Sequence, residues 1–365
     1  MAEVHSFGSQ PVCVHAWNSD RTQIALSPNN NEVEIYEKCG RQWKKIHTLT
    51  EHTGRVTGID WAPKSQRLVT CSSDRNAYVW SLDQNQWKPT LVILRINRAA
   101  TCVKWSPNED KFAVGSGARV ISVCYFEQDN DWWVSKHIKK PIRSTILSLD
   151  WHPNNILIAA GSSDFKARVF SGYIKDIEPK PSATNWGKKM TFGNVMQEFS
   201  MPSDGWVQGV KFSESGEKIV FVSQDSSIGV AYGGEEAVTM KTSHLPFCDC
   251  TWLTEYSIVA VGHDCNPMLF STDDRCSAIT FINRLDQVSK NAGAKTMSAM
   301  DRFKMMDKKA STDTQSDDIR TKHKNSITQV VKCGQGKFST SGMDGSVIIW
   351  DNKSLESSIS GLRIK

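Results

Sequence analysis

The chain has 365 residues and a formal net charge of +5 at pH 7. This length allows two ordinary domains or one large closed repeat, and the modest positive charge permits acidic partners without requiring nucleic acid. No run of eighteen apolar residues occurs and the first ten residues lack a basic start and an apolar core, so we expect neither a membrane-spanning helix nor secretion.

A strand-like repeat runs along almost the whole chain. Seven times, an apolar stretch that ends in a large residue is followed about twenty residues later by a second aromatic. The clearest copy extends from Val56 to Trp80. The second aromatics are Tyr36, Trp80, Tyr125, Phe170, Tyr232, Phe270 and Trp350. A repeat of this kind predicts an all-β, seven-bladed β-propeller that occupies residues 1–365 as one domain.

The N-terminal residues are expected to close the ring. Residues 4–7 precede the first blade, and we expect them to form the outer strand of the last blade. Joining the first and last blades in this way removes a free sheet edge, which would otherwise invite aggregation.

Two copies carry a recurring set of polar residues. An Asp lies six residues before the closing aromatic in several copies, as Asp74 does before Trp80, which resembles the WD-repeat family. In that family a His and the Asp tie a loop to a tight turn, so that no buried charge is left unpaired. The residues that match this network in the second and seventh copies are His52, Thr70, Asp74, Trp80, His323, Thr340, Asp344 and Trp350.

The repeat spacing is broken twice. The lesser insert, residues 178–202, falls between the predicted blades four and five, and its prolines and glycines favour a non-helical loop. Trp186 and Phe192 suggest that part of this loop packs against the ring. The larger insert, residues 286–326, separates the predicted blades six and seven.

A short amphipathic helix is expected inside the larger insert. Met297, Met300, Phe303 and Met306 recur every three residues and can form an apolar stripe opposite Asp301, Arg302 and Lys304. A helix of this length is marginal in water. We therefore weigh two alternatives, a stripe that folds back onto the propeller and a protruding arm that becomes ordered when it binds a partner.

Several segments together resemble one propeller family more closely. The segments TNWGKKMTFG, VGHDCNPMLF, DRFKMMDKKAS, HKNSIT and MDGSVIIWDNKSLESSISGLRIK are similar to the propeller subunits of the actin-related protein 2/3 complex, and the resemblance covers essentially the whole chain. It implies a non-catalytic scaffold without cofactor in a seven-subunit assembly that nucleates branched actin filaments. The implied location is the cytoplasm and actin cytoskeleton, with the nucleus as a second compartment.

The same resemblance implies partners and contact residues. The implied partners are the other subunits of that complex, actin or actin-related subunits, and activator peptides, with neither membrane nor nucleic acid among them. The implied partner-binding residues of the insert arm are Met297, Met300, Arg302, Phe303, Lys304 and Met306. The alternative hypothesis is a WD-repeat adaptor that recognises peptides in a chromatin or ubiquitin-ligase complex.

Catalytic and metal sites are not expected. The recurring Asp residues are explained by the turns beside their own closing aromatics, which argues against an enzyme. His244, Cys248, Cys250, His263 and Cys265 lack the usual zinc spacing, and we expect free thiols on the packed side of a strand.

One basic run stays open to two interpretations. Residues 136–140, with Arg143 nearby, follow the outer strand of the predicted third blade. This run is either a solvated loop or an electrostatic site for an acidic partner.

Overall fold

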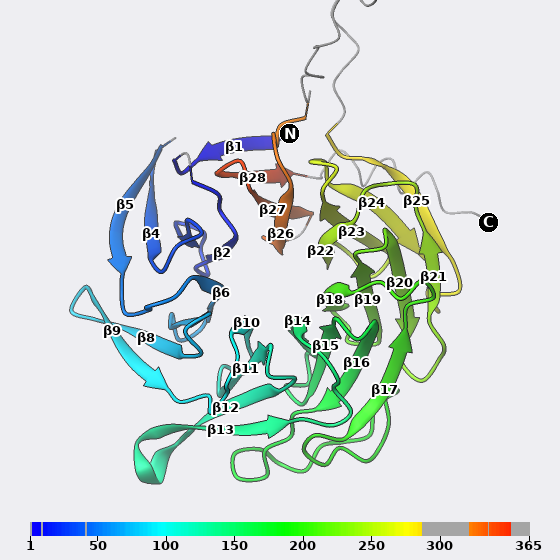
Figure 1. Cartoon of the computed structure of the whole chain (residues 1–365), viewed down its shortest axis with the longest axis horizontal. Coiled ribbons are helices and arrows are strands. Elements are labelled where there is room, and N and C mark those ends of the chain that lie inside the picture. The colour runs from blue at the N-terminus through cyan, green and yellow to red at the C-terminus, as the bar shows by residue number, and fades with distance from the viewer. Residues whose placement is uncertain (1, 9, 41, 287–320, 335, 352–365) are drawn as a thin grey trace, which may run out of the picture.

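The chain folds into a ring of seven four-stranded antiparallel sheets around a central opening (Figure 1). The structure is a computed structural model that describes residues 2–8, 10–40, 42–286, 321–334 and 336–351. The first strand of each sheet lies at the centre of the ring, and the fourth lies at the rim. The prediction of a seven-bladed β-propeller is therefore confirmed. Among the described residues, no helix has the length and apolar character needed to cross a membrane.

The first four blades follow one another along the chain. Blade one contains β2 Val14–Trp17, β3 Gln23–Ser27, β4 Val33–Cys39 and β5 Gln42–Leu49. Blade two contains β6 Val56–Trp61, β7 Leu68–Ser72, β8 Ala77–Asp83 and β9 Gln86–Val92. Blade three contains β10 Ala100–Trp105, β11 Lys111–Ser116, β12 Ile121–Glu127, the 3-10 turn η1 Gln128–Asn130 and β13 Trp132–Ile138. Blade four contains β14 Ile146–Trp151, β15 Leu157–Ser162, β16 Lys166–Ser171 and β17 Val195–Ser200.

The last three blades complete the ring. Blade five contains β18 Val207–Phe212, β19 Lys218–Ser223, β20 Ser227–Tyr232 and β21 Val238–Lys241. Blade six contains β22 Phe247–Trp252, β23 Ser257–Gly262, β24 Met268–Thr272 and β25 Ile279–Arg284. Blade seven contains β26 Ile327–Lys332, β27 Lys337–Gly342, β28 Ser346–Asp351 and, from the other end of the chain, β1 Ala2–Ser6.

The ring is closed by β1, as predicted. This strand pairs antiparallel with β28, from Ala2 opposite Trp350 to Ser6 opposite Ser346. The observed strand begins two residues before the predicted one. Its pairing gives blade seven its fourth strand and protects the edge of β28.

The core is divided into wedges between neighbouring blades. One wedge joins Val69 and Val79 of blade two to Phe112 and Trp133 of blade three, and equivalent clusters fill the other interfaces. Second strands such as β11, β15, β19 and β23 are buried along their whole length. Their runs of apolar and small residues follow from packing against a neighbouring blade on both faces.

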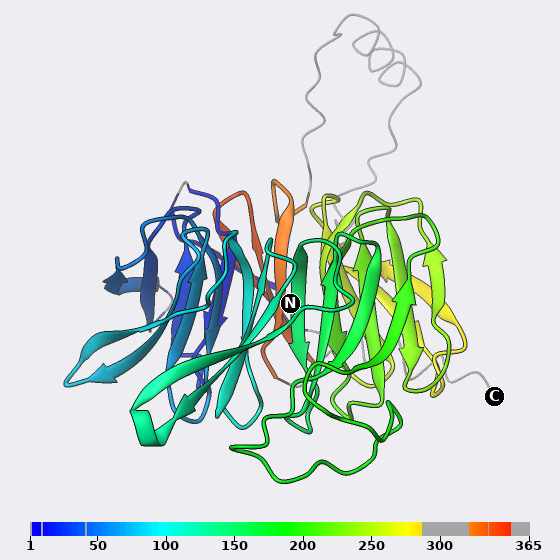
Figure 2. The same cartoon turned by 60° about the horizontal axis from the view of Figure 1, so that its bottom comes forward.

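The lesser insert lies inside blade four, which corrects its predicted position between blades. Within residues 178–202 the chain forms β17, which pairs with β16 as the outer strand of that blade. The excursion that precedes β17, residues 172–194, contains neither a helix nor a ladder strand and lies beneath the ring (Figure 2). Trp186 is only 3% exposed, and its indole N–H donates to the carbonyl oxygen of Gly216 over 2.7 Å. The excursion therefore packs against blade five.

Candidate interaction surfaces and the central channel

The predicted polar residues of blade two form one hydrogen-bonded chain. His52 Nδ1 lies 2.9 Å from Asp74 Oδ2, and His52 Nε2 lies 2.8 Å from Thr70 Oγ1. The Trp80 indole N–H donates to the same hydroxyl over 2.9 Å. The carboxylate places the histidine proton on Nδ1, so Thr70 donates to Nε2 and accepts from Trp80. Every polar atom in this buried chain has a partner of the correct kind.

The surroundings of this hydrogen-bonded series favour a charged Asp74 and a neutral His52. Burial disfavours the carboxylate, but hydrogen bonds from the Asn76 backbone N–H and from His52 outweigh it and lower the pKa of Asp74. Burial lowers the pKa of His52, although Asp74 opposes this effect. Asp74 also accepts from the Thr53 backbone N–H over 3.0 Å, so the entry loop of the blade is fixed to its tight turn.

Blade seven contains the same arrangement. His323 Nδ1 lies 3.0 Å from Asp344 Oδ2, and its Nε2 lies 2.7 Å from Thr340 Oγ1. The Trp350 indole N–H donates to Thr340 over 2.8 Å. The structure thus brings together four of the predicted residues in blade two and four in blade seven. The Thr hydroxyl joins the second strand of each blade to its third strand.

In blade four an arginine replaces the histidine. Arg168 Nη1 lies 2.9 Å from both oxygens of Asp164, and Arg168 Nε donates to Glu198 over 2.6 Å. Burial opposes the charge on Asp164, yet hydrogen bonds, chiefly from Arg168, lower its pKa. The turn Asp is therefore held by a histidine in blades two and seven and by an arginine in blade four, while its position stays the same.

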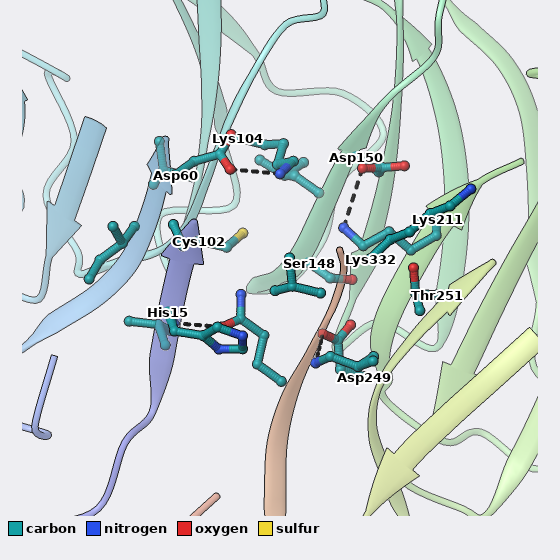
Figure 3. Close-up of a pocket in the computed structure, with 18 of the residues that line it drawn as sticks. His15, Asp60, Cys102, Lys104, Ser148, Asp150, Lys211, Asp249, Thr251 and Lys332 are labelled. Carbon is teal, nitrogen blue, oxygen red and sulfur yellow. Dashed lines mark hydrogen bonds and ion pairs between the residues drawn. The ribbon is translucent and has the colours of Figure 1, made fainter. Parts of the chain in front are cut away.

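A cavity of about 830 Å³ extends along the ring axis and is lined by the first strands (Figure 3). Neighbouring blades are joined there by an Asp on one first strand and a Lys on the next. Asp60 of β6 accepts from Lys104 Nζ over 2.7 Å and from the Trp105 backbone N–H over 2.7 Å. This carboxylate thereby links the inner strand of blade two to the inner strand of blade three.

The Asp–Lys link recurs between blades four and five, whereas between blades six and seven only the contact from an Asp to a backbone N–H recurs. Asp150 accepts from the Phe212 backbone N–H over 2.9 Å and lies 3.3 Å from Lys211 Nζ. Burial disfavours the Lys211 ammonium, but Asp150 and Asp249 raise its pKa. Asp249 accepts from the Val330 backbone N–H over 3.0 Å, and burial raises the pKa of this carboxyl. These charges hold adjacent blades together, so we assign the channel a structural role.

The Cys and His residues between positions 244 and 265, which were considered as metal ligands, do not form one cluster. Cys250 is buried in the core, whereas Cys248 lines the channel with its sulfur 3.7 Å from His263 Nε2. A β-bulge between Phe247 and Asp249 separates the two thiols, so the expectation that both face the packed side was wrong for Cys248. No group of three or more His, Cys, Asp or Glu positioned to hold a metal occurs in the described parts of the chain.

Two further predictions concern the insert arm and the basic run at residues 136–140. The partner-binding residues proposed for the insert arm, Met297, Met300, Arg302, Phe303, Lys304 and Met306, lie outside the described residues. The basic run begins within β13 and continues into the loop before β14. Its Lys136 pairs with Asp176 over 2.9 Å, whereas Lys139, Lys140 and Arg143 are exposed.

Sequence reasoning missed the charged links along the channel, although a signal was present. The residue just before the strand-ending aromatic is an Asp in blades two and four (Asp60 and Asp150). It is a Lys in blades three and five (Lys104 and Lys211). This alternation of sign follows the order of the blades from two to five. A charge just before the end of a central strand is unusual enough to have indicated contact between neighbouring blades.

Comparisons with known proteins agree on one family. The family described as "WD domain, G-beta repeat" matches residues 43–81, 136–171 and 316–351. The chain is 58% identical to "Actin-related protein 2/3 complex subunit 1A-B" of Xenopus laevis, over 99% of both chains. It is 44% identical to "Actin-related protein 2/3 complex subunit 1" of Schizosaccharomyces pombe, over 93% of this chain and 97% of the relative. With "Actin-related protein 2/3 complex subunit 1B" of Arabidopsis thaliana the identity is 41% over 98% of both. The chain therefore belongs to the family of actin-related protein 2/3 complex subunit 1.

Proposed function

We propose that this protein is a non-catalytic scaffold subunit of an actin-related protein 2/3 complex and supports the nucleation of branched actin filaments. The observation that carries the proposal is identity above 40% along nearly the full length to relatives named as subunit 1 of that complex. A rigid ring whose blades are joined by buried polar links suits a role in positioning other proteins. Its partners would be the other subunits, actin or actin-related subunits and activator peptides, at the cytoplasmic actin cytoskeleton.

Purification of the endogenous protein tests the assignment. The expected result is recovery of two actin-related proteins and the other subunits in fixed stoichiometry with this chain. Recovery of histones or of ubiquitin-ligase subunits in fixed stoichiometry would instead support the alternative, a WD-repeat adaptor in another assembly, and would overturn the proposal.

Within this function, we assign partner contact to residues 295–309, which fall in the sequence between β25 and β26. Replacing them with a Gly-Ser linker should leave the melting temperature of the reconstituted complex unchanged. Branching nucleation should fall by about tenfold, equivalent to about 1.4 kcal/mol of lost contact energy. The matched control replaces the polar flank, residues 311–316, and should leave nucleation unchanged. Equal branching rates for the two variants would exclude a role for the apolar stripe.

A further inference from the structure

One end of the ring over blades two to four is built from six loops and turns. Because neighbouring strands are antiparallel, the loop that enters a blade and the turn between its second and third strands lie at the same end. Hydrogen bonds of 2.9 Å join the two in each blade, from Ser73 N–H to Arg55, from Gly117 N–H to Ala99 and from Ser163 N–H to Thr145. We call this end the basic face; it comprises residues 50–55, 73–76, 93–99, 117–120, 139–145 and 163–165.

The basic face has many exposed cations and few available carboxylates. Its exposed cationic side chains are Arg55, Arg75, Arg95, Arg98, Arg119, Lys139, Lys140 and Arg143. Among the described residues, no carboxylate forms an ion pair with any of them; Arg55 donates to the Asn29 side chain and Arg95 to the Ser135 carbonyl oxygen. The face carries three carboxylates, those of Glu51, Asp74 and Asp164, and Asp164 is engaged by the Arg168 guanidinium. The exposed cations therefore outnumber the negative charges of this face.

The cations of blades three and four lie on loops that contact one another. A Cβ added to Gly117 would lie 3.4 Å from Arg98 Cβ and 3.8 Å from Thr145 Oγ1, so this turn touches the entry loops of both blades. Arg98, Arg119 and Arg143 are carried by these three segments. Like charges gathered on one face without carboxylate partners repel one another, and bound anions relieve that repulsion.

Exposed aromatic side chains continue the face toward blade five. The Arg143 backbone N–H donates to Asp164 Oδ2 over 3.1 Å, and Phe165, the next residue, is 36% exposed. The Phe165 carbonyl accepts from the Met201 N–H over 2.9 Å at the start of the loop that carries Trp206, which is 46% exposed. Tryptophan prefers the interface between water and lipid, because its ring is apolar and its N–H remains hydrogen-bonded.

We propose that the basic face binds anionic phospholipid headgroups at a membrane surface, with Phe165 and Trp206 entering the headgroup layer. Basic side chains spread over six loops match a surface that carries many anions, and each such residue near the surface contributes to binding. Aromatic side chains beside the cations suit a membrane surface, where charged headgroups cover an apolar layer of acyl chains. The lack of an apolar run long enough to span a membrane does not bear on a charged face that contacts the membrane surface.

Vesicle co-sedimentation of the full-length chain, in the assembly with which it purifies, tests the proposal. The probes are vesicles of phosphatidylcholine alone and vesicles that also contain phosphatidylserine and a phosphatidylinositol bisphosphate. The test variant combines Arg98→Gln, Arg119→Gln and Arg143→Gln. Its affinity for the anionic vesicles should fall about 100-fold, since each basic side chain contributes about fivefold. The matched control combines Lys180→Gln, Lys188→Gln and Lys189→Gln, three exposed lysines of the excursion beneath the ring, and should bind as the natural protein does.

Further measurements separate lipid from other anionic partners. Trp206→Ala should lower vesicle binding at high salt, where the charge contribution is screened and the aromatic contribution remains. Equal losses in the test and control variants would mean nonspecific attraction to positive charge and would overturn the proposal. It would also be overturned if the chain bound a soluble inositol phosphate or an acidic peptide through these arginines but bound no vesicles. Because none of these readouts depends on actin, failure here leaves the proposed nucleating function untouched.

Discussion

At Thr70 and Thr340 a single hydroxyl serves two partners, an imidazole nitrogen and an indole N–H. Each hydroxyl is fully buried, so an unpaired partner would keep its full desolvation cost. The turn Asp then holds the outer nitrogen of the imidazole. In the series Asp, His, Thr and Trp, the type of each residue thus follows from the donor or acceptor that its neighbour offers.

Replacing Asp74 tests this residue-scale account. Asp74→Asn removes the charged acceptor of His52 and should lower the free energy of unfolding by about 2 kcal/mol at pH 7. Because the folded-state pKa of Asp74 is lowered, its contribution is present above the ordinary value of 3.8 and is lost as the pH falls through the folded pKa. The difference between the variant and the natural protein should therefore shrink below pH 3.8, as urea denaturation at several pH values would show.

The matched control is Asp83→Asn, which removes the same charge at an exposed hairpin. Asp83 and its partner Lys88 are both more than half exposed, so the expected change is within about 0.5 kcal/mol. Equal losses for the two variants would contradict a special role for the buried chain.

At the scale of elements, the excursion of blade four is held by a buried ion pair. Lys111 Nζ, on β11, lies 2.5 Å from Glu178 Oε2 and donates to the Gly172 carbonyl over 3.1 Å. Glu178 also accepts from the Asn155 side chain over 2.8 Å and from the Ile174 N–H over 2.8 Å. Burial lowers the pKa of Lys111, although Glu178 opposes this effect. A segment without ladder hydrogen bonds is thereby fixed to blades three and four.

Removing one partner of this pair should cost more than removing both. Lys111→Met leaves Glu178 buried and uncompensated, and the free energy of unfolding should fall by about 3 kcal/mol. Adding Glu178→Gln should recover part of this loss, because the glutamine is neutral. Chemical denaturation measures both changes, and limited proteolysis within residues 179–194 reports release of the excursion. Lys88→Met serves as the exposed control, and a Lys111→Met protein as stable as that control would refute the account.

At the scale of the whole molecule, the first and the last described strands meet in blade seven. Besides the pairing of β1 with β28, His15 of β2 contacts Ser339 over 2.7 Å and Ser341 over 3.1 Å on β27. Burial lowers the pKa of His15 to about 3, so it joins the two blades as a neutral imidazole. Ring closure therefore uses a strand at the rim and a polar contact near the axis.

Deleting residues 1–6 should open the rim of blade seven. The melting temperature should fall by about 5 °C or more, and light scattering should reveal association through the exposed edge of β28. Val4→Thr, at a side chain that is 51% exposed, keeps the strand and should leave both measurements unchanged. A shortened protein that stays monodisperse with an unaltered melting temperature would show that β1 is dispensable for closure.

The sequence by itself determined the number of blades, most strand positions, the closing role of the N-terminus and the family. These features depend on residues that lie close together in the sequence of each repeat, such as the strand-ending Trp61 and the turn residue Asp74. Only the tertiary structure decided which side chains of different repeats contact one another. Asp60 and Lys104 are 44 residues apart and meet because the ring places their first strands side by side. The basic face and the burial of Trp186 against blade five depend on the same closed geometry, since curvature around an axis brings side chains of successive repeats into contact.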